Sequence, residues 1–384
     1  MFWLSSYDYF VMSRVLFVQR MIPDYRLTFF VCLHDRLKEF GIDLYVSTGE
    51  SLPEDCLKDS VEKHTWIIRH KNHYLYKQVH FHSIQRLKSY DLVIVMQENS
   101  HLINYLLLLR RYVLGRPLVA FFGHGKNLNI QGKIVREYFK RKVSLLPDWW
   151  FAYTALAGRV VIDNGYPKHS ITIVNNTIDG KEIKQGCTRQ TEEERTLLKE
   201  KLGIDKNSRV ALFCGRLMDN KVSFLIEALE AIREKVGAFE AIIIGAGTLE
   251  KRIRLISSQH HWLHYEGAVY GSDRAKYFCV SDVFLMPGGV GLAILDAFAA
   301  QVPIITTDCG IHGPEIDYLE DGVNGIMTSN RVETFVEKVC GLLGNERMLT
   351  EMKANAKRSS EEYSIENMAD NFVMGIRQVL NRVQ

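Results

Sequence analysis

Two kinds of segment alternate along this chain. Short apolar runs, such as RVLFVQ from Arg14 to Gln19, predict strands buried on both faces, and longer segments with helical apolar spacing predict helices. Their regular alternation predicts a parallel sheet covered by helices. In the first half we expect strands at 14–19, 42–47, 66–69, 91–96, 117–122, 148–153 and 171–175, and helices at 27–40, 99–113, 131–146 and 155–164.

A polar and charged segment, 177–208, interrupts this pattern and predicts a linker followed by a peripheral helix. A second alternation follows, with strands expected at 210–214, 239–245, 263–266, 283–286 and 304–307, helices at 222–235, 272–279 and 292–300, and a helical tail at 332–383. Because 384 residues exceed what one hydrophobic core usually serves, we predict two doubly wound α/β domains, 1–178 and 179–364, and a final segment, 365–384.

The stretch from Phe284 to Thr307, FLMPGGVGLAILDAFAAQVPIITT, predicts a strand, a glycine turn, a helix and a strand. A glycine turn that opens a helix at the carboxyl end of a parallel strand presents backbone N–H groups, which suit a phosphate. Asp296 lies a little over one helical turn further on, where its carboxylate can reach the hydroxyls of a ribose. The turn itself comprises Gly289, Val290, Gly291 and Leu292.

A second strand end carries two cations. Gly215 and Arg216 follow the apolar run 210–214, and Lys221 comes shortly afterwards, just before a helix. A guanidinium and an ammonium at the carboxyl edge of a parallel sheet suit a diphosphate, which needs several donors and compensating charge. The alternative is a solvated loop with two unrelated charges.

Together these two segments resemble the donor site of GT-B glycosyltransferases, in particular the large and mostly retaining family 4. In that family two Glu residues bracket a Gly-Phe-Gly-Leu-like turn, and a Gly-Arg…Lys pattern, here GRLMDNK, holds the diphosphate. The second acid is present as Asp296, but Gly288 occupies the position of the first. The resemblance implies the GT-B fold, in which two Rossmann-like domains face a cleft and the last helix crosses back to the first domain.

The resemblance also implies roles for further residues. Gly245 would lie beside the nucleotide, although Gly-x-Gly after a strand serves close strand–helix packing equally well. Val269 belongs to a turn whose backbone meets the nucleobase in relatives. His124, in FFGHGKN, matches a functional histidine of the family, with an ordinary surface histidine as the alternative. Glu315 resembles the acid of a Gly-x-Pro-Glu segment, with a carboxylate favoured by a helix dipole as the alternative. His124 and Glu315 are thus the catalytic candidates.

Acceptor contacts are expected in the first domain, in two loops that follow strands: Arg20, Tyr25, Arg26, Lys126 and Asn127. The basic amphipathic segment 133–142 is typical either of a helix on anionic lipid or of a solvated helix face. Relatives that glycosylate lipid-linked acceptors use such a helix. We therefore expect a saccharide or lipid-linked saccharide acceptor and peripheral membrane contact through 133–142.

Composition and charge limit the binding partners and the cellular compartment that we expect for this protein. A net charge of +3 is too small to indicate a nucleic-acid partner. Seven dispersed cysteines without a Cys-x-x-Cys pair favour reduced thiols in a cytoplasm over a disulfide framework. No apolar run approaches the ~18 residues of a membrane span, and no signal peptide is evident. We expect a cytoplasmic protein, with the inner face of the plasma membrane as its site of action.

These features predict a glycosyltransferase that uses a nucleotide sugar, a UDP-sugar in preference to a GDP-sugar, in bacterial-type polysaccharide or glycolipid assembly. The chain has no Asp-x-Asp motif, and the family neutralises the leaving diphosphate with Arg, Lys and helix dipoles. We therefore expect no metal and no cofactor, and retention of anomeric configuration. Two alternatives remain: a non-catalytic GT-B subunit that binds a sugar nucleotide or a partner transferase, and a GT-B nucleotide-sugar epimerase.

Overall fold

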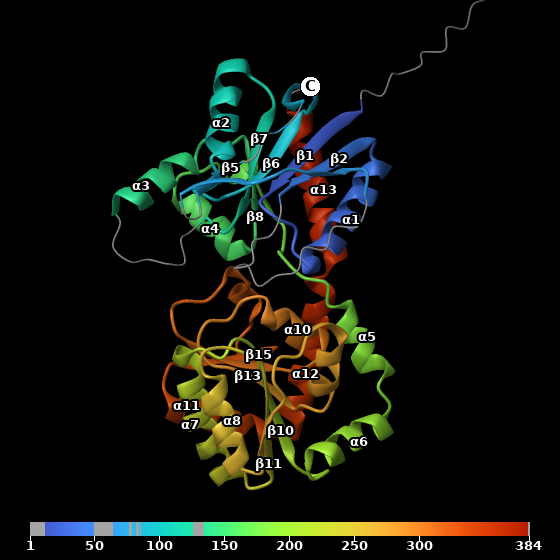
Figure 1. Cartoon of the computed structure of the whole chain (residues 1–384), viewed down its shortest axis with the longest axis vertical. Coiled ribbons are helices and arrows are strands. Elements are labelled where there is room, and N and C mark those ends of the chain that lie inside the picture. Colours follow the sequence, from blue (N-terminus) through green and yellow to red (C-terminus); the bar gives the residue numbers. More distant parts are fainter. Residues whose placement is uncertain are drawn as a thin grey trace, which may run out of the picture. The chain divides into compact units, whose positions relative to one another are not determined.

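The computed structural model describes residues 12–49, 64–76, 79–81, 84, 86–125 and 134–382. Its contacts divide the chain into two compact units, Met1–Asn176 with Ile365–Gln384, and Thr177–Ser364. Each unit has its own parallel sheet and its own hydrophobic core (Figure 1). Among the described residues, every helix is too short or too polar to cross a bilayer.

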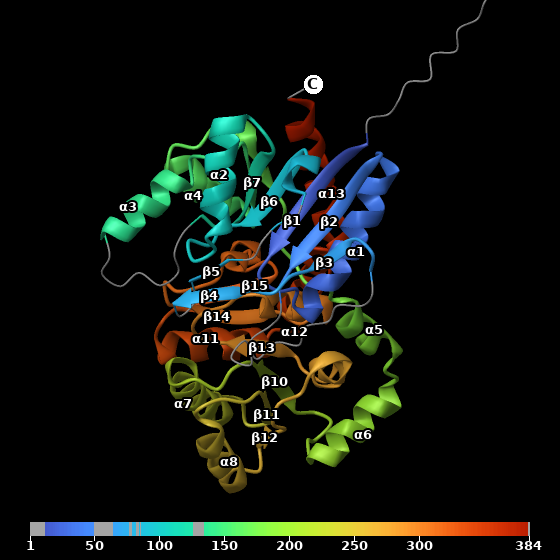
Figure 2. The same cartoon turned by 45° about the horizontal axis from the view of Figure 1, so that its top comes forward.

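The first unit is built on a parallel sheet with the order β3-β2-β1-β6-β7-β8-β9, and Figure 2 shows β2, β1, β6 and β7 side by side. Its strands are β1 (Ser13–Gln19), β2 (Ile42–Thr48), β3 (Ile67–Arg69), β6 (Leu92–Met96), β7 (Leu118–Gly123), β8 (Trp149–Ala152) and β9 (Ile171–Ile173). Its helices are α1 (Asp24–Glu39), α2 (Ile103–Leu114), α3 (Ile134–Val143), α4 (Ala155–Asp163) and α13 (Ile365–Asn381), with the 3-10 turns η2 (Leu87–Ser89) and η3 (Lys168–Ser170). The antiparallel pair β4 (His73–Tyr76) and β5 (Val79–Phe81) was not predicted.

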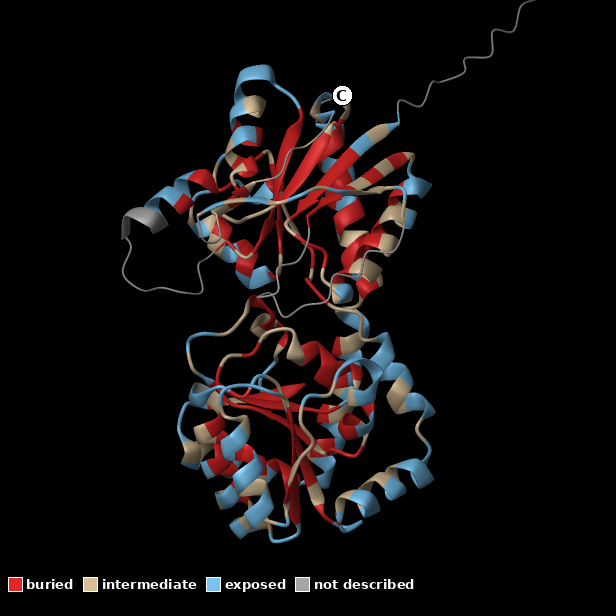
Figure 3. Cartoon of the chain, in the orientation of Figure 1, coloured by how far each residue is buried: buried red, intermediate tan, exposed pale blue. Residues whose placement is uncertain are grey.

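Helices cover both faces of this sheet. Phe17 of β1, Phe29 of α1 and Phe372 of α13 are fully buried on one face, and the Phe372 ring lies 5.2 Å from that of Phe29. The last helix of the chain therefore completes the core of the first unit. On the other face, Val93 and Val119 pack with Leu107 of α2. The central strands β6, β7 and β8 are buried (Figure 3), which explains their continuous apolar sequence, whereas the outer strands β3 and β9 are only half-buried or exposed.

The second unit repeats this architecture with the strand order β12-β11-β10-β13-β14-β15. Its strands are β10 (Arg209–Cys214), β11 (Phe239–Ile244), β12 (Leu263–Tyr265), β13 (Val283–Met286), β14 (Ile304–Asp308) and β15 (Gly325–Ser329). Its helices are α5 (Lys181–Arg189), α6 (Glu192–Leu202), α7 (Asp219–Val236), α8 (Glu250–Gln259), α9 (Ala275–Cys279), α10 (Ala293–Ala299), α11 (Val332–Leu343) and α12 (Glu346–Glu362), with the 3-10 turns η4 (Gly271–Arg274) and η5 (Pro314–Tyr318).

The strand order of the second unit reverses between β10 and β13. In open α/β sheets, ligands bind outside the carboxyl ends of the strands at such a switch point. The segments that follow β10 and β13 begin with Gly215 and Pro287, so both glycine-rich turns singled out in the sequence flank this point.

The segment 177–208 is helical rather than a linker followed by one helix. Thr191 and Glu194 form a capping box that starts α6, and Gly203 ends this helix in the left-handed conformation. The preceding helix, α5, packs against α9, where Gly186 faces Ala275 so closely that a Cβ on Gly186 would overlap the Ala275 side chain. Segment 177–208 is therefore part of the second unit.

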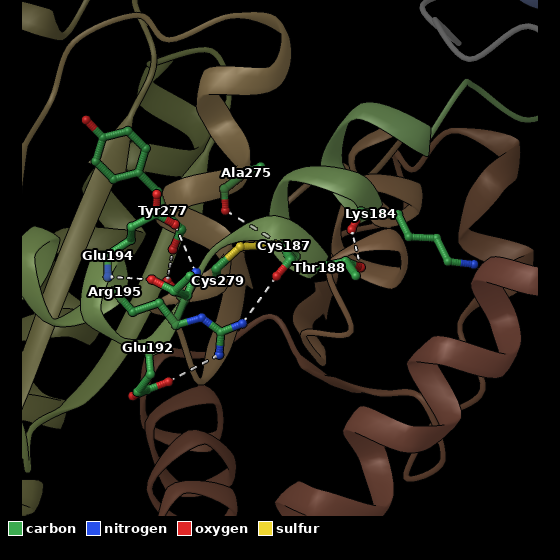
Figure 4. The surroundings of a disulfide bond; sticks show 11 residues. Lys184, Cys187, Thr188, Glu192, Glu194, Arg195, Ala275, Tyr277 and Cys279 are labelled. Carbon is green, nitrogen blue, oxygen red and sulfur yellow. Dashed lines mark hydrogen bonds and ion pairs between the residues drawn. A yellow bond between two sulfur atoms is a disulfide. The ribbon is translucent and has the colours of Figure 1, made fainter.

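The close approach of α5 and α9 also joins two cysteines. Cys187 and Cys279 form a disulfide with their Cα atoms 5.4 Å apart (Figure 4). The prediction of reduced thiols is wrong for this pair, because the packing of two helices brings together residues 92 positions apart in the sequence. Cys32, Cys214, Cys309 and Cys340 are free thiols.

Candidate donor-binding site

Three consecutive turns pack edge to edge at the carboxyl ends of β10, β11 and β12. The Gly215 N–H donates to the Ile244 carbonyl at 3.0 Å, and the Gly245 N–H donates to the Gly267 carbonyl at 2.8 Å. Gly245 has φ +147°, and a Cβ at this position would overlap the carbonyl oxygen of Gly215. Close backbone packing therefore accounts for Gly245 without any ligand. Val269 follows in the last of these turns, half-buried against the core.

The predicted donor turn after β13 is held from several sides. The Gly288 N–H donates to Thr307 Oγ1 at 3.0 Å, and the Gly313 N–H donates to the Val290 carbonyl at 2.6 Å. The Lys221 ammonium at the start of α7 donates to the Gly289 carbonyl. The structure therefore brings Lys221 directly to the turn at 289–292, as a shared site for both motifs requires.

Within this turn, several polar groups face no protein partner. Among the described residues, the N–H groups of Gly289, Gly291 and Leu292 make no hydrogen bond to the protein. A Cβ built on Gly291 would meet no atom within 4 Å, so open space adjoins the turn. Gly289 differs, since its Cβ would lie 2.9 Å from the Ile311 carbonyl oxygen. The space beside Gly291 is thus where a ligand could approach these donors.

Gly288, at the position of the family's first acid, is itself a structural requirement. It is buried and has φ +81°, in the left-handed region that favours glycine. Its carbonyl accepts a hydrogen bond from Thr306 Oγ1 at 3.3 Å. The backbone here is shaped around glycine, so an acidic side chain at 288 would be strained.

The two cations of the predicted clamp differ in environment. Arg216 is exposed, and no ion pair holds it among the described residues. Lys221 is half-buried, and this burial lowers the pKa of its ammonium from the ordinary value. An anion beside Lys221 would offset the cost of burying its charge.

Asp296 on α10 is buried, with its side chain 7% exposed, and it is paired with Arg274 of η4. Arg274 Nη1 donates to Asp296 Oδ2 at 2.5 Å, whereas Oδ1 has no hydrogen-bond partner among the described residues. Burial raises the pKa of the Asp296 carboxyl, and the neighbouring guanidinium lowers it in part. Asp296 Oδ2 is therefore used by the ion pair with Arg274, and Oδ1 remains to accept a hydrogen bond from a ligand hydroxyl. No sequence motif pointed to Arg274, which lies 22 residues upstream of Asp296.

We expect Asp296→Ala to lower the free energy of unfolding of the unliganded protein by about 3 kcal/mol, because it leaves Arg274 partly buried without a counter-charge. Urea denaturation measures this effect. The double variant Asp296→Leu/Arg274→Met should recover most of the loss, since apolar pairs can replace buried ion pairs. A loss below about 1 kcal/mol in the single variant would show that the pair does not stabilise the fold.

Glu315 lies in η5 and is buried, at 4% exposed. A Cβ on Gly313 would lie 2.9 Å from Glu315 Oε2 and 3.1 Å from the Gly291 Cα. The carboxylate therefore packs immediately behind the donor turn. Its burial fits a group that shapes the turn as well as one that touches a substrate.

His124 lies in the first unit, directly after β7. Its ring is half-buried and meets the Tyr153 ring edge to face, with centroids 5.8 Å apart. The next residue, Gly125, donates its N–H to Gln97 Oε1 at 3.0 Å, and a Cβ there would press on Val161 of α4. The loop that carries His124 is thus fixed at the carboxyl edge of the first sheet.

The structure places the predicted acceptor residues in different environments. Arg20 follows β1, and its carbonyl accepts a hydrogen bond from Asn72 Nδ2 at 2.9 Å. Tyr25 and Arg26 lie in the first turn of α1 rather than in a loop. Arg26 is 6% exposed and donates to Asn176 Oδ1 at 2.9 Å, so we no longer expect it to contact an acceptor. Lys126 and Asn127 lie outside the described residues.

His312, which no sequence motif pointed to, also contacts the donor turn, and Cys309 contacts His312 in turn. The Val290 N–H donates to His312 Nδ1 at 3.1 Å, and His312 Nε2 lies 3.6 Å from Cys309 Sγ. Both residues come from the loop between β14 and η5. The signal available was their position, since this loop also follows the carboxyl end of a predicted strand.

The sequence of the second unit is similar to those of known glycosyltransferases. Residues 208–345, which lie within the second unit, match the family model described as glycosyl transferases group 1. The chain is 30% identical over 183 residues to the alpha-monoglucosyldiacylglycerol synthase of Acholeplasma laidlawii, a match that covers 46% of this chain and 45% of the synthase. The chain thus spans about half the length of this relative.

Solved structures match over nearly the whole chain at low sequence identity. HepE of Anabaena, solved in complex with UDP, gives a TM-score of 0.66 at 14% identity and covers 96% of this chain and 100% of its own. A glycosyltransferase from Rickettsia africae gives a TM-score of 0.68 at 14% identity, covering 97% and 99%. The predicted two-domain α/β architecture of the GT-B class is therefore confirmed.

Proposed function

We propose that this chain, whose residues 208–345 match glycosyl transferases group 1, transfers a sugar from a nucleotide-sugar donor to a saccharide or lipid-linked acceptor. The observation that carries the proposal is the contact between Lys221 and the turn at Gly289, beside the exposed Arg216 and backbone N–H groups that have no partner among the described residues. This arrangement offers two cations and several N–H donors at the switch point of the sheet, which suits a diphosphate.

In this proposal Arg216 and Lys221 stabilise the negative charge that develops on the leaving diphosphate, without a metal ion. Asp296 Oδ1 accepts a hydrogen bond from a ribose hydroxyl. Retention of anomeric configuration is proposed from the family resemblance. A UDP-sugar is the preferred donor, and the UDP complex of the structurally similar HepE supports this choice.

The first experiment is thermal-shift screening of the whole chain against UDP, GDP and their sugar conjugates. A ligand that binds only the folded state raises its stability, and the gain grows with the logarithm of the ligand concentration relative to Kd. We expect UDP and at least one UDP-sugar to raise the Tm, and GDP to do so less. Absence of a shift with every nucleotide would contradict the proposal.

Membrane contact belongs to the same proposal, and a face of the first unit supports it. Exposed apolar side chains on α2 and α3, together with the loop after α3, form what we call the α2–α3 face: Leu109, Tyr112, Val113, Phe139 and Leu146. The rings of Tyr105 and Phe139 lie 6.0 Å apart, so both helices contribute to one surface. Exposed Arg116, Arg141 and Lys142 adjoin it, whereas Lys140 is buried and cannot contact lipid. Apolar side chains among cations suit an anionic lipid surface.

We expect the double variant Tyr112→Glu/Val113→Glu to bind phosphatidylglycerol vesicles about tenfold more weakly in a sedimentation assay, because two apolar side chains no longer enter the bilayer interface. Leu255→Glu is the control, since Leu255 of α8 is also an exposed apolar side chain but lies in the second unit. Equal vesicle binding by the double variant and the wild type would contradict lipid contact through this face.

The cellular site of this reaction is proposed to be the cytoplasm, at the inner face of the plasma membrane. The support is the proposed use of a nucleotide sugar and of lipid-linked acceptors. Cysteine usage no longer adds support, because Cys187 and Cys279 are joined.

A non-catalytic sugar-nucleotide-binding subunit is the second candidate, and Gly288 favours it. The backbone conformation at this position would strain the acidic residue that the family resemblance implies there. Binding of UDP without turnover on any acceptor would favour this second candidate.

A further inference from the structure

His312 is placed to control the shape of the donor turn from outside it. Its imidazole is half-buried in the loop between β14 and η5, and Nδ1 accepts the Val290 N–H at 3.1 Å. Val290 is 2% exposed, so its N–H has no access to water in place of the imidazole. A buried N–H without an acceptor costs about 1–3 kcal/mol, and the turn would have to rearrange to avoid this cost.

The hydrogen bond also fixes the protonation state of His312. A backbone amide can only donate, so Nδ1 must carry no proton, and a neutral ring then has its proton on Nε2. Nε2 lies 3.6 Å from Cys309 Sγ, where the sulfur can accept a weak hydrogen bond. Protonation of Nδ1 would place two donors face to face and break the contact with Val290.

The surroundings favour the neutral ring. Burial lowers the pKa of His312, and the positive charge of Lys221 lowers it further. A backbone hydrogen bond with Thr307 and the charge of Asp308 act in the opposite direction, each with a smaller effect than burial and a larger one than Lys221. Cys309 is the other titratable group in contact with the ring. The contact with Val290 is thus present at neutral pH and is lost as the pH falls through the lowered pKa.

We propose that His312 is a positioning residue for the sugar-nucleotide donor: neutral imidazole, oriented by Cys309, holds Val290 so that the adjacent N–H groups of Gly289 and Gly291 remain directed toward the ligand. The inference rests on the proposed function, because it assigns the turn to the donor. It adds a pH-sensitive element to that site, such that acidification releases the turn and weakens donor binding.

The test compares His312→Asn with His312→Leu. Asn Oδ1 occupies nearly the position of His Nδ1 and can accept the Val290 N–H at every pH, whereas Leu keeps the volume without an acceptor. UDP affinity is measured by titration calorimetry from pH 5 to pH 8. The terminal phosphate of UDP itself titrates near pH 6, so the quantity compared is the ratio of wild-type to His312→Asn affinity at each pH.

At pH 7.5 we expect His312→Leu to bind UDP about tenfold more weakly than the wild type, and His312→Asn to stay within about twofold. As the pH falls, the wild type should lose affinity relative to His312→Asn. His261→Asn, an exposed histidine of the same unit, should follow the wild type throughout. Wild-type affinity in His312→Leu, or a ratio that stays constant from pH 5 to pH 8, would overturn the proposal.

A second measurement needs no nucleotide. Hydrogen–deuterium exchange of peptides that cover 287–293 should be about tenfold faster in His312→Leu than in the wild type, and unchanged in His312→Asn. If the wild type bound no UDP, the proposed function would fail, while these exchange rates would still decide whether His312 holds the turn. Unchanged exchange in His312→Leu would overturn the positioning role.

Discussion

Arg216→Ala and Lys221→Met are each expected to weaken UDP binding by about 30-fold, which corresponds to about 2 kcal/mol for a lost charge-assisted hydrogen bond. Arg216 is exposed and unpaired among the described residues, so its removal should leave the Tm of the unliganded protein unchanged. Methionine at 221 keeps the apolar stem of the half-buried lysine and removes only its ammonium. Titration calorimetry with UDP measures both variants.

Lys235→Ala provides the control for this pair. Lys235 is an exposed cation near the C-terminal end of α7, the helix whose first turn carries Lys221, and it lies at the opposite edge of the sheet. Its removal changes the net charge equally and should leave UDP affinity within about twofold. Unaltered affinity in both Arg216→Ala and Lys221→Met would exclude the diphosphate clamp.

His124→Ala is expected to lower kcat by about 100-fold with little change in UDP affinity, the pattern of a group that acts mainly in the transition state. The imidazole follows β7 at the carboxyl edge of the first sheet, in a loop fixed by Gly125. On this view it donates to the donor sugar or its phosphate during transfer. Initial rates at saturating donor and acceptor measure the effect.

His169→Ala is the matched control for His124. His169 is exposed in η3, which immediately precedes β9 and so lies at the amino edge of the same sheet. The His169→Ala variant should turn over its substrates at the wild-type rate. Turnover that survives His124→Ala would remove His124 from the mechanism and leave Glu315 as the catalytic candidate.

The strands were predictable because parallel strands buried on both faces leave uninterrupted apolar runs. The strand β13 has the bounds expected from its sequence, Val283–Met286. The pair β4 and β5 was missed because its residues, HYLY and VHF, mix aromatic and polar side chains without a clear period. Strands that are not buried on both faces lose the apolar signal.

The candidate site could be proposed from the sequence only where one short segment carries the chemistry. The glycine turn and the Arg216–Lys221 pattern are local, and the structure brings Lys221 to this turn. Arg274, His312 and the joined cysteines depend on contacts between distant segments, which one sequence does not reveal. Arg26 illustrates the same limit, because its partners Asn176 and Met368 lie 150 and 342 residues away.

Gly288 shows why a motif gap needs a structure to interpret it. Its φ of +81° and its two hydrogen bonds to threonines show a backbone built around glycine. We therefore expect Gly288→Glu to lose stability rather than to restore a missing catalytic group.

The central claim is that the second unit binds a sugar nucleotide and the chain transfers its sugar. The most direct measurement is release of UDP from UDP-sugars by the whole chain, with cell-derived lipid-linked saccharides and oligosaccharides as acceptors. We expect acceptor-dependent UDP release that Lys221→Met abolishes and Lys235→Ala leaves intact. If no acceptor led to UDP release, or if Lys221→Met and the wild type released UDP equally, the proposed function would be contradicted.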